Sequence, residues 1–319
     1  MSERAALRLA FLGTPEFAVP ALRALARTRH TLAGVVSQPD RPRGRGRATE
    51  PTPVAAEARA LGLALLQPEK VGDEASLAWL RERRPDLGIV VAFGQFIPKS
   101  VRELPPRGMV NAHASLLPRW RGAAPIAWAI DAGDRRTGVS VMRVAREMDA
   151  GDVCLVRELE IGADETTGDL SPRMAELAAG ALVEAVEEIA AARAVFRPQD
   201  PAGVTLAPKL DRAFAKLDLG QPAERVLRRI RAATPRPGVD LALLQAKKTL
   251  RIVRARLGAT HSGVASPGAL RAAAGRLELA CAAAWLALVE VQLAGRRALP
   301  AAELLRGFRI APGERAEAA

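Results

Sequence analysis

The sequence predicts a two-domain α/β protein, in which a parallel sheet with helices on both faces is followed by a small antiparallel β-barrel. The chain has 319 residues, a length that favours two domains over one. Continuous apolar runs alternate with helix-like segments over residues 7–193, as in parallel sheets that are buried on both faces. Beyond a proline-containing stretch at 196–208, the pattern changes to short alternating runs separated by turns, which indicates antiparallel strands.

The first part of the chain contains six apolar runs and four helix-like segments. The runs predict strands over residues 7–12, 31–36, 63–66, 87–93, 109–114 and 139–144. Apolar residues at helical spacing predict helices over residues 17–25, 75–84, 124–131 and 170–193. We expect Ser171 to cap the last helix and Pro172 to be its first residue, because the first turn does not use the N–H that proline lacks. Ligands of such sheets bind outside the carboxyl ends of the strands, so a site is expected in the loops that follow them.

The second part of the chain has the pattern of a separate domain. We interpret residues 196–208 as a linker, so that a domain over 1–195 precedes a domain over 209–319. Within the later domain, residues 224–232 predict a helix, residues 253–257 and 289–293 alternate like strands, and residues 280–287 fit either a strand or a helix. Several short strands of this kind favour a small antiparallel barrel.

The net charge of +12 falls almost wholly on the last third of the chain. Residues 206–319 hold 20 Lys and Arg against 9 Asp and Glu, whereas residues 1–205 hold 27 against 26. A domain this basic favours a polyanionic partner, and nucleic acid is the commonest one in the cytoplasm. A general preference for arginine would spread the charge over both parts, so the asymmetry argues against that alternative.

Two further features of the sequence limit the classes of protein to which the chain could belong. No apolar run of 18 residues lacks charges, and the start of the sequence has no basic cap followed by an apolar signal core. We therefore expect a cytoplasmic protein without a membrane span. Cys154 and Cys281 lie far apart without metal-ligand spacing, so we expect both to pack as small apolar residues and we expect no metal.

The densest chemical signal is the run from Asn111 to Gly122. Side chains at alternate positions of a strand share a face, so Asn111 and His113 should project together near the carboxyl end of the strand predicted at 109–114. An amide beside an imidazole polarises a carbonyl and handles a proton at one reacting centre. A carboxylate would complete the set, and Asp149 and Asp152 follow the next apolar run, although their spacing alone favours ordinary turn residues.

These residues carry a resemblance to a known family. The run Asn-x-His-x-Ser-Leu-Leu-Pro at 111–118, the Arg-Gly pair at 121–122 and Met-Asp-x-Gly-Asp at 148–152 are similar to motifs of the folate-dependent formyltransferases. Further similar stretches are Gly13–Phe17, Gln38–Pro42 and Val91–Gly94. The resemblance covers residues 7–210 and continues more loosely to the end. It implies a Rossmann-like parallel-sheet formyltransferase domain followed by a small OB-like β-barrel domain.

The resemblance also implies roles for single residues. Asn111 would donate to the formyl oxygen as it becomes negative, His113 would assist and manage the proton, and Asp149 would hold His113 and an ordered water. The formyl donor would be 10-formyltetrahydrofolate, contacted by the loop Ser115, Leu116, Leu117 and Pro118 and by the backbone around Phe93, Gly94 and Gln95. Such a reaction needs no metal, because positioning and stabilisation of the oxyanion suffice for attack by a neutral amine.

The acceptor amine is indicated by an arginine-rich segment rather than by the catalytic motif. Members of the family formylate a tRNA-bound methionine, a purine precursor or an amino sugar nucleotide. Arg41, Arg43, Arg45 and Arg47 alternate with glycine and proline, which predicts a mobile, exposed loop that becomes ordered on RNA. The resemblance aligns this segment with the loop that engages the tRNA acceptor stem, with Arg45 as its principal arginine. Together with the basic second domain, it favours initiator methionyl-tRNA as the partner of a translation-related enzyme, which we expect to be a monomer.

Two other interpretations stay open at this point. One is a formyltransferase for a small amine such as an amino sugar nucleotide, which would not need the arginine loop or the basic second domain. The other is a nucleotide-binding or RNA-binding protein without catalysis. Gly13-Thr14-Pro15 lacks the glycine spacing of a dinucleotide fingerprint, and the presence of Asn111, His113 and Asp149 together argues against a purely binding role.

Overall fold

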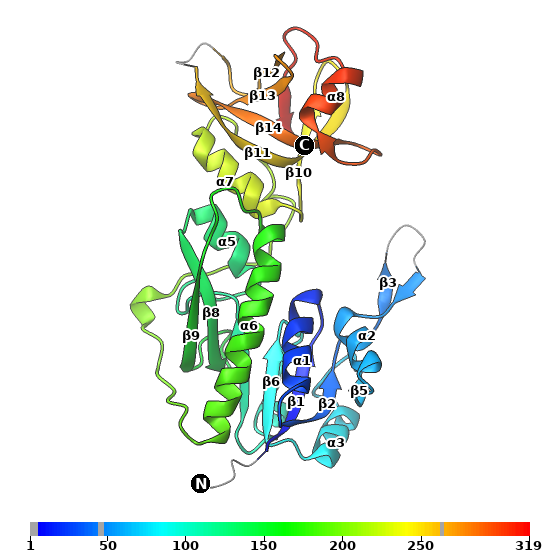
Figure 1. Ribbon diagram of the computed structural model, residues 1–319, viewed down its shortest axis with the longest axis vertical. Helices are drawn as coiled ribbons and strands as arrows, with labels where there is room; N and C mark the ends of the chain where they lie inside the picture. Colours follow the sequence, from blue (N-terminus) through cyan, green and yellow to red (C-terminus); the bar gives the residue numbers. More distant parts are fainter. Residues whose placement is uncertain (1–5, 44–47, 262–264) are drawn as a thin grey trace. The chain divides into compact units, whose positions relative to one another are not determined.

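The computed structural model describes residues 6–43, 48–261 and 265–319, and it divides into two compact units (Figure 1). The first unit comprises residues 1–122, 136–160 and 171–207. The second comprises residues 208–319 together with two segments from the earlier part of the chain, 123–135 and 161–170. Each unit has its own sheet and its own core.

The first unit is built on a seven-stranded sheet in the order β5-β2-β1-β6-β7-β8-β9. Its strands are β1 (Arg8–Gly13), β2 (Thr31–Val36), β5 (Leu65–Leu66), β6 (Leu87–Val91), β7 (Met109–His113), β8 (Arg136–Arg143) and β9 (Val153–Glu160). The five strands from β5 to β7 are parallel, which confirms the predicted α/β class. β2 and β6 lie on opposite sides of β1, so the strand order reverses there, and the loops after β1 and β6 meet at this switch point.

The prediction that the strand after β7 is also parallel is wrong. β8 runs antiparallel to β7, and β9 runs antiparallel to β8. A parallel connection needs a helix that crosses over the sheet. The helix between β7 and β8, α5 (Pro125–Ala132), belongs to the second unit and makes no such crossover, so the chain returns in the opposite direction.

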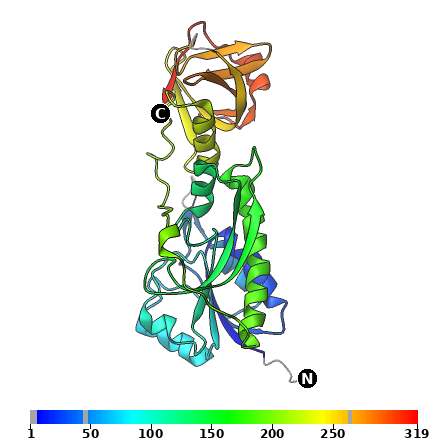
Figure 2. The ribbon, with the colours of Figure 1, turned by 90° about the vertical axis from the view of Figure 1, so that its left-hand side faces the viewer.

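Helices cover both faces of this sheet (Figure 2). They are α1 (Val19–Ala26), α2 (Pro53–Ala60), α3 (Glu74–Arg83), α4 (Lys99–Arg102) and α6 (Thr167–Ala190), with a 3-10 turn η1 at Glu16–Ala18. Leu80 of α3 and Val101 of α4 share one buried cluster with Leu12, Val90 and Met109 of the strands. α1 and α6 lie on the opposite face. The predicted strands and helices of this region are thus present, with shorter strands at 65–66 and 87–91.

The predicted start of α6 is wrong by several residues. The helix begins at Thr167, so Pro172 lies inside it and Ser171 is not its cap. Thr166 forms a reciprocal cap with Asp169: its hydroxyl accepts from the Asp169 N–H at 3.2 Å, and the Asp169 carboxylate accepts from the Thr166 N–H at 3.0 Å. This pair provides hydrogen-bond partners for N–H groups of the first helical turn, so the helix begins before Ser171.

The second unit contains an antiparallel, curled sheet in the order β12-β13-β14-β11-β10-β16, with β15 paired to β14. Its elements are α7 (Ala223–Ala233), β10 (Val239–Leu243), β11 (Lys248–Thr260), β12 (Leu270–Ala273), β13 (Arg276–Ala280), β14 (Ala284–Leu293), β15 (Leu299–Pro300), α8 (Ala301–Gly307) and β16 (Ala316–Ala318). A single bridge between Ala269 and Arg315 joins the two ends of the sheet, as the predicted small β-barrel domain requires. The ambiguous stretch at 280–287 is strand from Ala284 onward.

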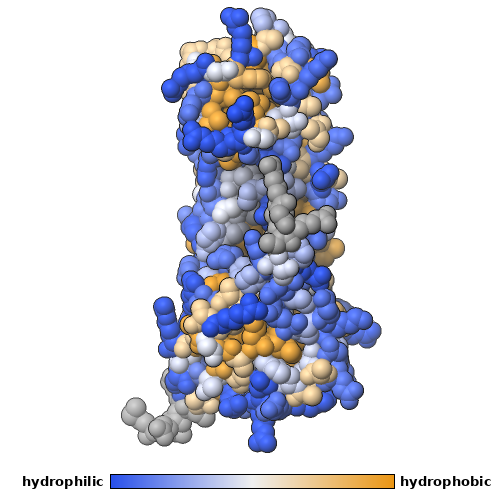
Figure 3. Space-filling model, turned by 90° about the vertical axis from the view of Figure 1, so that its right-hand side faces the viewer, coloured by the Kyte–Doolittle hydropathy of each residue, from blue (hydrophilic) through white to orange (hydrophobic). Residues whose placement is uncertain are grey.

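Hydrophilic residues cover much of the face drawn in Figure 3, and apolar patches interrupt them in each unit. Among large apolar side chains, Phe96 and Met148 are each 73% exposed, and Leu206 is 69% exposed. Over the described ranges, no helix combines the length and the apolar character that crossing a membrane requires.

Candidate active site

One face of β7 changes from apolar to polar along the strand. This face carries the side chains of Met109, Asn111 and His113, because alternate residues of a strand point to the same side. Met109 packs in the buried cluster under α3 and α4, Asn111 is half-buried, and His113 is only 5% exposed. Asn111 pairs with Val90 of β6 and with Met142 of β8, so this end of the strand has a neighbour on each side.

The Asn111 carboxamide is available to a ligand. No hydrogen bond joins this side chain to another group within the described parts of the chain, although Asn111 is paired with both neighbouring strands. A half-buried amide on a paired central strand is held in place by its backbone while its N–H groups remain free. That is what a preorganised donor to a developing oxyanion requires.

His113 and Asp149 lie together, although they are distant in the sequence. Nδ1 of His113 is 3.5 Å from Oδ2 of Asp149, and Nε2 of His113 is 2.8 Å from the backbone oxygen of Trp120. Because a carbonyl only accepts, Nε2 carries the hydrogen of the second contact and Nδ1 faces the carboxylate. Both side chains are largely buried, with 6% and 13% exposed. A separation of 3.5 Å is longer than a usual hydrogen bond, so the two groups interact chiefly through charge in this geometry.

Asp149 is held in a strained turn. Its φ is +52°, a left-handed conformation that residues with a Cβ rarely adopt, and its Oδ2 accepts from the Gly122 N–H at 2.9 Å. Gly151, two residues later, leaves no room for a side chain, because a Cβ there would lie 1.9 Å from the Arg143 oxygen. The turn therefore depends on its glycine to present the carboxylate to His113.

The loop after β7 is tied down by hydroxyl groups. Ser115 is fully buried and donates to the Arg119 oxygen at 2.6 Å, which closes the loop on itself. Ser140 of β8 accepts from the Leu117 N–H at 3.0 Å and donates to the Ser115 oxygen at 2.8 Å. Leu116 packs against Gly138, where a Cβ would lie 2.5 Å from its side chain. The side chains of Ser115 and Leu116, which were both predicted to contact folate, are thus already engaged inside the protein.

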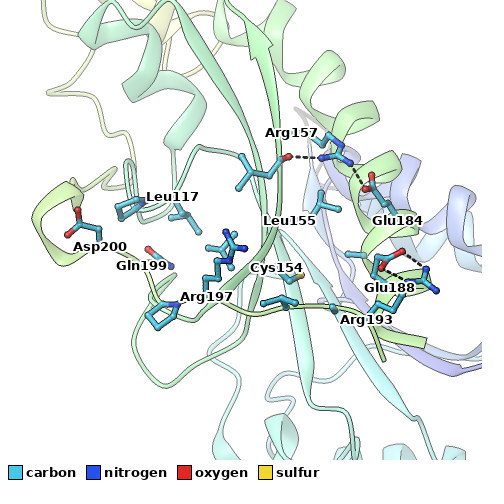
Figure 4. Close-up of a pocket in the computed structure, with 17 residues that line it drawn as sticks. Leu117, Cys154, Leu155, Arg157, Glu184, Glu188, Arg193, Arg197, Gln199 and Asp200 are labelled. Carbon is cyan, nitrogen blue, oxygen red and sulfur yellow. Dashed lines mark hydrogen bonds and ion pairs between the residues drawn. The ribbon is translucent and has the colours of Figure 1, made fainter. Parts of the chain in front are cut away.

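The other two residues of that loop, Leu117 and Pro118, line a cavity (Figure 4). This cavity of about 680 Å³ lies between β9, the later part of α6 and residues 193–200. Arg157 pairs with Glu184 and Arg193 with Glu188 along its wall. None of Asn111, His113 and Asp149 lines it, so the cavity is separate from the three predicted catalytic side chains.

The segment after β6 presents a peptide edge beside β7. Phe93 is buried, and its oxygen accepts from the Thr14 hydroxyl at 2.7 Å and the Gln38 amide at 2.9 Å. Gln95 is also occupied, since its side chain accepts from the Val71 N–H and donates to the Pro68 oxygen. Gly94 has a φ of +81° and is exposed. Phe93 and Gln95 therefore shape this segment through their own contacts, while Gly94 and Phe96 are exposed and Gln95 is half-buried between them.

The arginine-rich segment is only partly described. Its ends pair as an antiparallel hairpin of β3 (Arg41–Arg43) and β4 (Ala48–Glu50), with Pro42 opposite Thr49, and the sequence did not predict these two short strands. Arg41 forms an exposed ion pair with Glu69 at 3.0 Å. Arg45 and Arg47 lie outside the described residues.

Many arginines of the basic second unit have partners within the unit. Asp131 of α5 is 2% exposed and accepts from Arg225 and Arg229 of α7. Further pairs join Arg251 to Asp240, Arg254 to Asp169, Arg256 to Asp164 and Arg271 to Glu278. The net charge therefore overstates the number of cations that are free to meet a polyanion, which the sequence could not reveal.

Cations with few partners gather at one end of the second sheet. The turn between β10 and β11 carries Lys247, Lys248 begins β11, and the turn after β14 carries Arg296 and Arg297. These turns are neighbours, since the Ala294 N–H donates to the Thr249 oxygen at 3.1 Å. In the described residues no ion pair within 4.0 Å involves Lys247, Lys248 or Arg296, and Arg297 has a 3.8 Å contact with Glu303.

The cysteines are poorly suited to nucleophilic chemistry. Burial raises the pKa of the Cys154 thiol to about 11 and that of the Cys281 thiol to about 12, so both stay protonated near neutral pH. In the described part of the chain, no cluster of three or more His, Cys, Asp or Glu side chains has the arrangement of a metal site.

Sequence reasoning missed three residues that build the site: Ser140, Gln199 and Thr205. Gln199 donates to the Asp149 and Gly151 oxygens at 2.8 Å each, and Thr205 accepts from the Trp120 N–H at 2.9 Å. Gln199 and Thr205 belong to the segment interpreted as a linker, where nothing in the local pattern points to such contacts.

Comparison with known proteins covers both parts of the chain. Residues 7–186 match the formyl transferase family model, and residues 209–309 match the model of the formyl transferase C-terminal domain. The methionyl-tRNA formyltransferase of Anaeromyxobacter dehalogenans is 46% identical over 306 residues, which are 95% of this chain and 97% of that protein. That of Xanthomonas campestris is 43% identical over 311 residues, 97% of this chain and 100% of that protein.

Two solved structures share the fold. HypX from Aquifex aeolicus, in complex with tetrahydrofolic acid, has a TM-score of 0.63 at 20% identity, over 94% of this chain and 47% of that one. WlaRD, a sugar 3N-formyl transferase, has a TM-score of 0.65 at 13% identity, over 92% of this chain and 100% of that one. At these identities the likeness concerns the fold alone.

Proposed function

This chain belongs to the methionyl-tRNA formyltransferases of the formyl transferase family, and on that premise we propose that it transfers the formyl group of 10-formyltetrahydrofolate to the amino group of methionine on initiator methionyl-tRNA. The proposal rests chiefly on the 46% identity to the enzyme of Anaeromyxobacter dehalogenans, which extends over nearly the whole of both proteins and includes the basic second part. The product, N-formylmethionyl-tRNA, would serve translation initiation. The predicted division into domains over 1–195 and 209–319 is kept as part of the proposal, as are the predicted monomer and the cytoplasmic location.

The donor would lie beside the segment after β6. A reduced pterin presents an amide-like hydrogen-bonding edge, and the backbone of Gly94, Gln95 and Phe96 would be the matching partner for it. The 73% exposed ring of Phe96 adds an apolar surface for the rest of the donor. Support comes from the position of this segment, which follows β6 at the switch in strand order and is the neighbour of the β7 loop. A structure neighbour, HypX, was solved with tetrahydrofolic acid.

The three polar side chains divide the chemistry. As the amine nitrogen bonds to the formyl carbon, Asn111 donates to the formyl oxygen and stabilises the charge that develops there. His113, oriented by Asp149 and the Trp120 oxygen, takes up the proton that the amine releases. The folate nitrogen needs one proton in order to leave, so the pair returns the proton to it, through an ordered water at Asp149. No net proton is gained or lost.

The tRNA would be recognised by two groups of cations. The first is the arginine hairpin with Arg41, Arg43, Arg45 and Arg47, whose spacing motivates the assignment. The second is the cationic end of the second sheet, with Lys247, Lys248, Arg296 and Arg297. In the described residues Lys247, Lys248 and Arg296 have no ion-pair partner within 4.0 Å, so they are free to neutralise phosphates and release counterions. Arg41 and Arg297 would exchange their contacts with Glu69 and Glu303 for phosphates.

An acceptor assay tests the proposal. The purified protein is given 10-formyltetrahydrofolate and either charged initiator tRNA or small amines, amino sugar nucleotides among them. We expect formylation of methionyl-tRNA, and we expect Asn111→Ala and His113→Ala to lose at least about 100-fold in turnover while their circular dichroism is unchanged. Preferential formylation of a small amine, or near-normal turnover of either variant, would contradict the proposal. Arg45→Ala should weaken use of tRNA without affecting folate binding.

A further inference from the structure

We propose that residues 197–207 form a strap that positions the catalytic pair, with Gln199 and Thr205 as positioning residues. The inference rests on the proposed function, since it assigns His113 and Asp149 to the reaction. The strap follows α6 and contains the 3-10 turn η2 (Pro201–Gly203). It lies within the first unit, as do all the residues that it contacts in this argument.

Gln199 joins the two loops that converge on the site. Its oxygen accepts from Nε and Nη2 of Arg121 at 3.0 and 2.8 Å, and its amide nitrogen donates to the Asp149 and Gly151 oxygens at 2.8 Å each. Both N–H groups of the carboxamide are thereby used on the turn that presents the Asp149 carboxylate. That turn needs external support, because Asp149 has a left-handed backbone with a φ of +52°.

Thr205 holds the other loop. Its hydroxyl accepts from the Trp120 N–H at 2.9 Å, and its backbone oxygen accepts from the Arg121 N–H at 2.9 Å. The Arg121 oxygen in turn accepts from the Ala207 N–H at 2.7 Å, which gives a short bridge between the two segments. The approach is close enough that a Cβ on Gly122 would lie 2.6 Å from the Ala207 oxygen.

The loop at 120–122 touches both members of the catalytic pair. Its Trp120 oxygen accepts from Nε2 of His113 at 2.8 Å, and its Gly122 N–H donates to Oδ2 of Asp149 at 2.9 Å. The strap therefore reaches His113 through Thr205 and Trp120, and Asp149 through Gln199. A shift of about 1 Å in such a pair costs about 100-fold in rate, even when the change lies away from the reacting atoms.

Substitution of the two side chains tests the strap. Gln199→Leu removes both sets of hydrogen bonds at similar volume, and Thr205→Val removes the hydroxyl while Thr205→Ser retains it. We expect Gln199→Leu and Thr205→Val to lower kcat about 10- to 100-fold, with KM for donor and acceptor within about threefold of wild type, and Thr205→Ser to recover most of the activity. Gln221→Leu is the matched control, because the same change of side chain in the second unit removes a hydrogen bond to Asp218 and lies outside the strap.

Hydrogen exchange supplies a readout that does not depend on the reaction. The amides of residues 120–122 should exchange faster in Gln199→Leu and Thr205→Val than in wild type, and at the wild-type rate in Thr205→Ser and Gln221→Leu. Unchanged exchange in both damaging variants, or a kcat within about twofold of wild type in both, would overturn the strap. His113→Ala, measured alongside, reports on the proposed function separately. If it retained activity, the catalytic assignment would fail while the exchange result would still decide whether the strap holds the loop.

Discussion

Replacing Asp149 by asparagine tests how much the carboxylate contributes to catalysis. The side chains of Asp149 and His113 face each other at 3.5 Å with only 13% and 6% of their surfaces exposed. When His113 takes up the proton of the amine, a full charge develops beside the carboxylate. Coulomb's law at this distance and an effective dielectric of about 20 sets a ceiling of about 5 kcal/mol for that attraction.

The Asp149→Asn substitution removes the charge while it preserves most of the local contacts. The amide that replaces the carboxylate can keep an oxygen at the position of Oδ2, which accepts from the Gly122 N–H and faces Nδ1 of His113. The ring should therefore stay in place, and the amide dipole should recover about half of the lost attraction. We expect a loss of about 2–3 kcal/mol in the transition state, which is about 100-fold in kcat. The free energy of unfolding should change little.

Single-turnover formylation with a radiolabelled formyl donor and saturating methionyl-tRNA measures the effect on the chemical step. Asp152→Asn is the matched control, because it removes the same charge from the same turn, where the carboxylate does not contact His113. We expect the control to keep nearly wild-type turnover. A turnover of Asp149→Asn within about threefold of wild type would refute the assignment of the carboxylate to the proton-handling pair.

Three further outcomes are expected. Lys247→Glu combined with Lys248→Glu should raise KM for methionyl-tRNA about tenfold and reduce its dependence on salt, while kcat at saturation is unchanged. Asp131→Ala should lower the free energy of unfolding in urea by about 2–4 kcal/mol, because it leaves Arg225 and Arg229 without their buried carboxylate; a loss below about 1 kcal/mol would contradict this. The Arg254 guanidinium lowers the pKa of Asp169 to about 2, so the stabilisation by that carboxylate is present above about pH 4 and disappears as the pH falls to about 2. The difference of about 1 kcal/mol between wild type and Asp169→Asn at about pH 6 should therefore vanish in acid, and a difference that persists near pH 2 would exclude this ion pair as its source.

Local patterns predicted the positions of the strands better than the directions in which the strands run. The apolar runs located β1, β2, β6 and β7 because a strand buried on both faces needs apolar residues at every position. The same patterns could not show that β8 runs antiparallel to β7. Direction depends on the path of the connection, and here α5 belongs to the second unit instead of crossing the sheet.

The start of α6 illustrates a conflict between two local signals. Pro172 favours a helix that begins beside it, whereas Thr166 and Asp169 form a reciprocal cap earlier in the chain. Asp169 also pairs with Arg254, which is 85 positions away. A tertiary ion pair thus stabilises one of the two candidate starts of the helix. The residues around the start do not show this ion pair, so local preferences could not predict it.

The sequence by itself determined six strands and four helices of the first part in their order along the chain, the shared face of Asn111 and His113, and the motifs that assign the chain to its family. These features depend on neighbouring residues, whose backbone geometry and burial follow from short-range periodicity. Only the tertiary structure decided that Asp149 meets His113, that Gln199 and Thr205 hold their loops, and that many arginines of the basic second unit are neutralised within it. Those contacts join residues tens of positions apart, and their geometry depends on the paths of loops that local patterns do not specify.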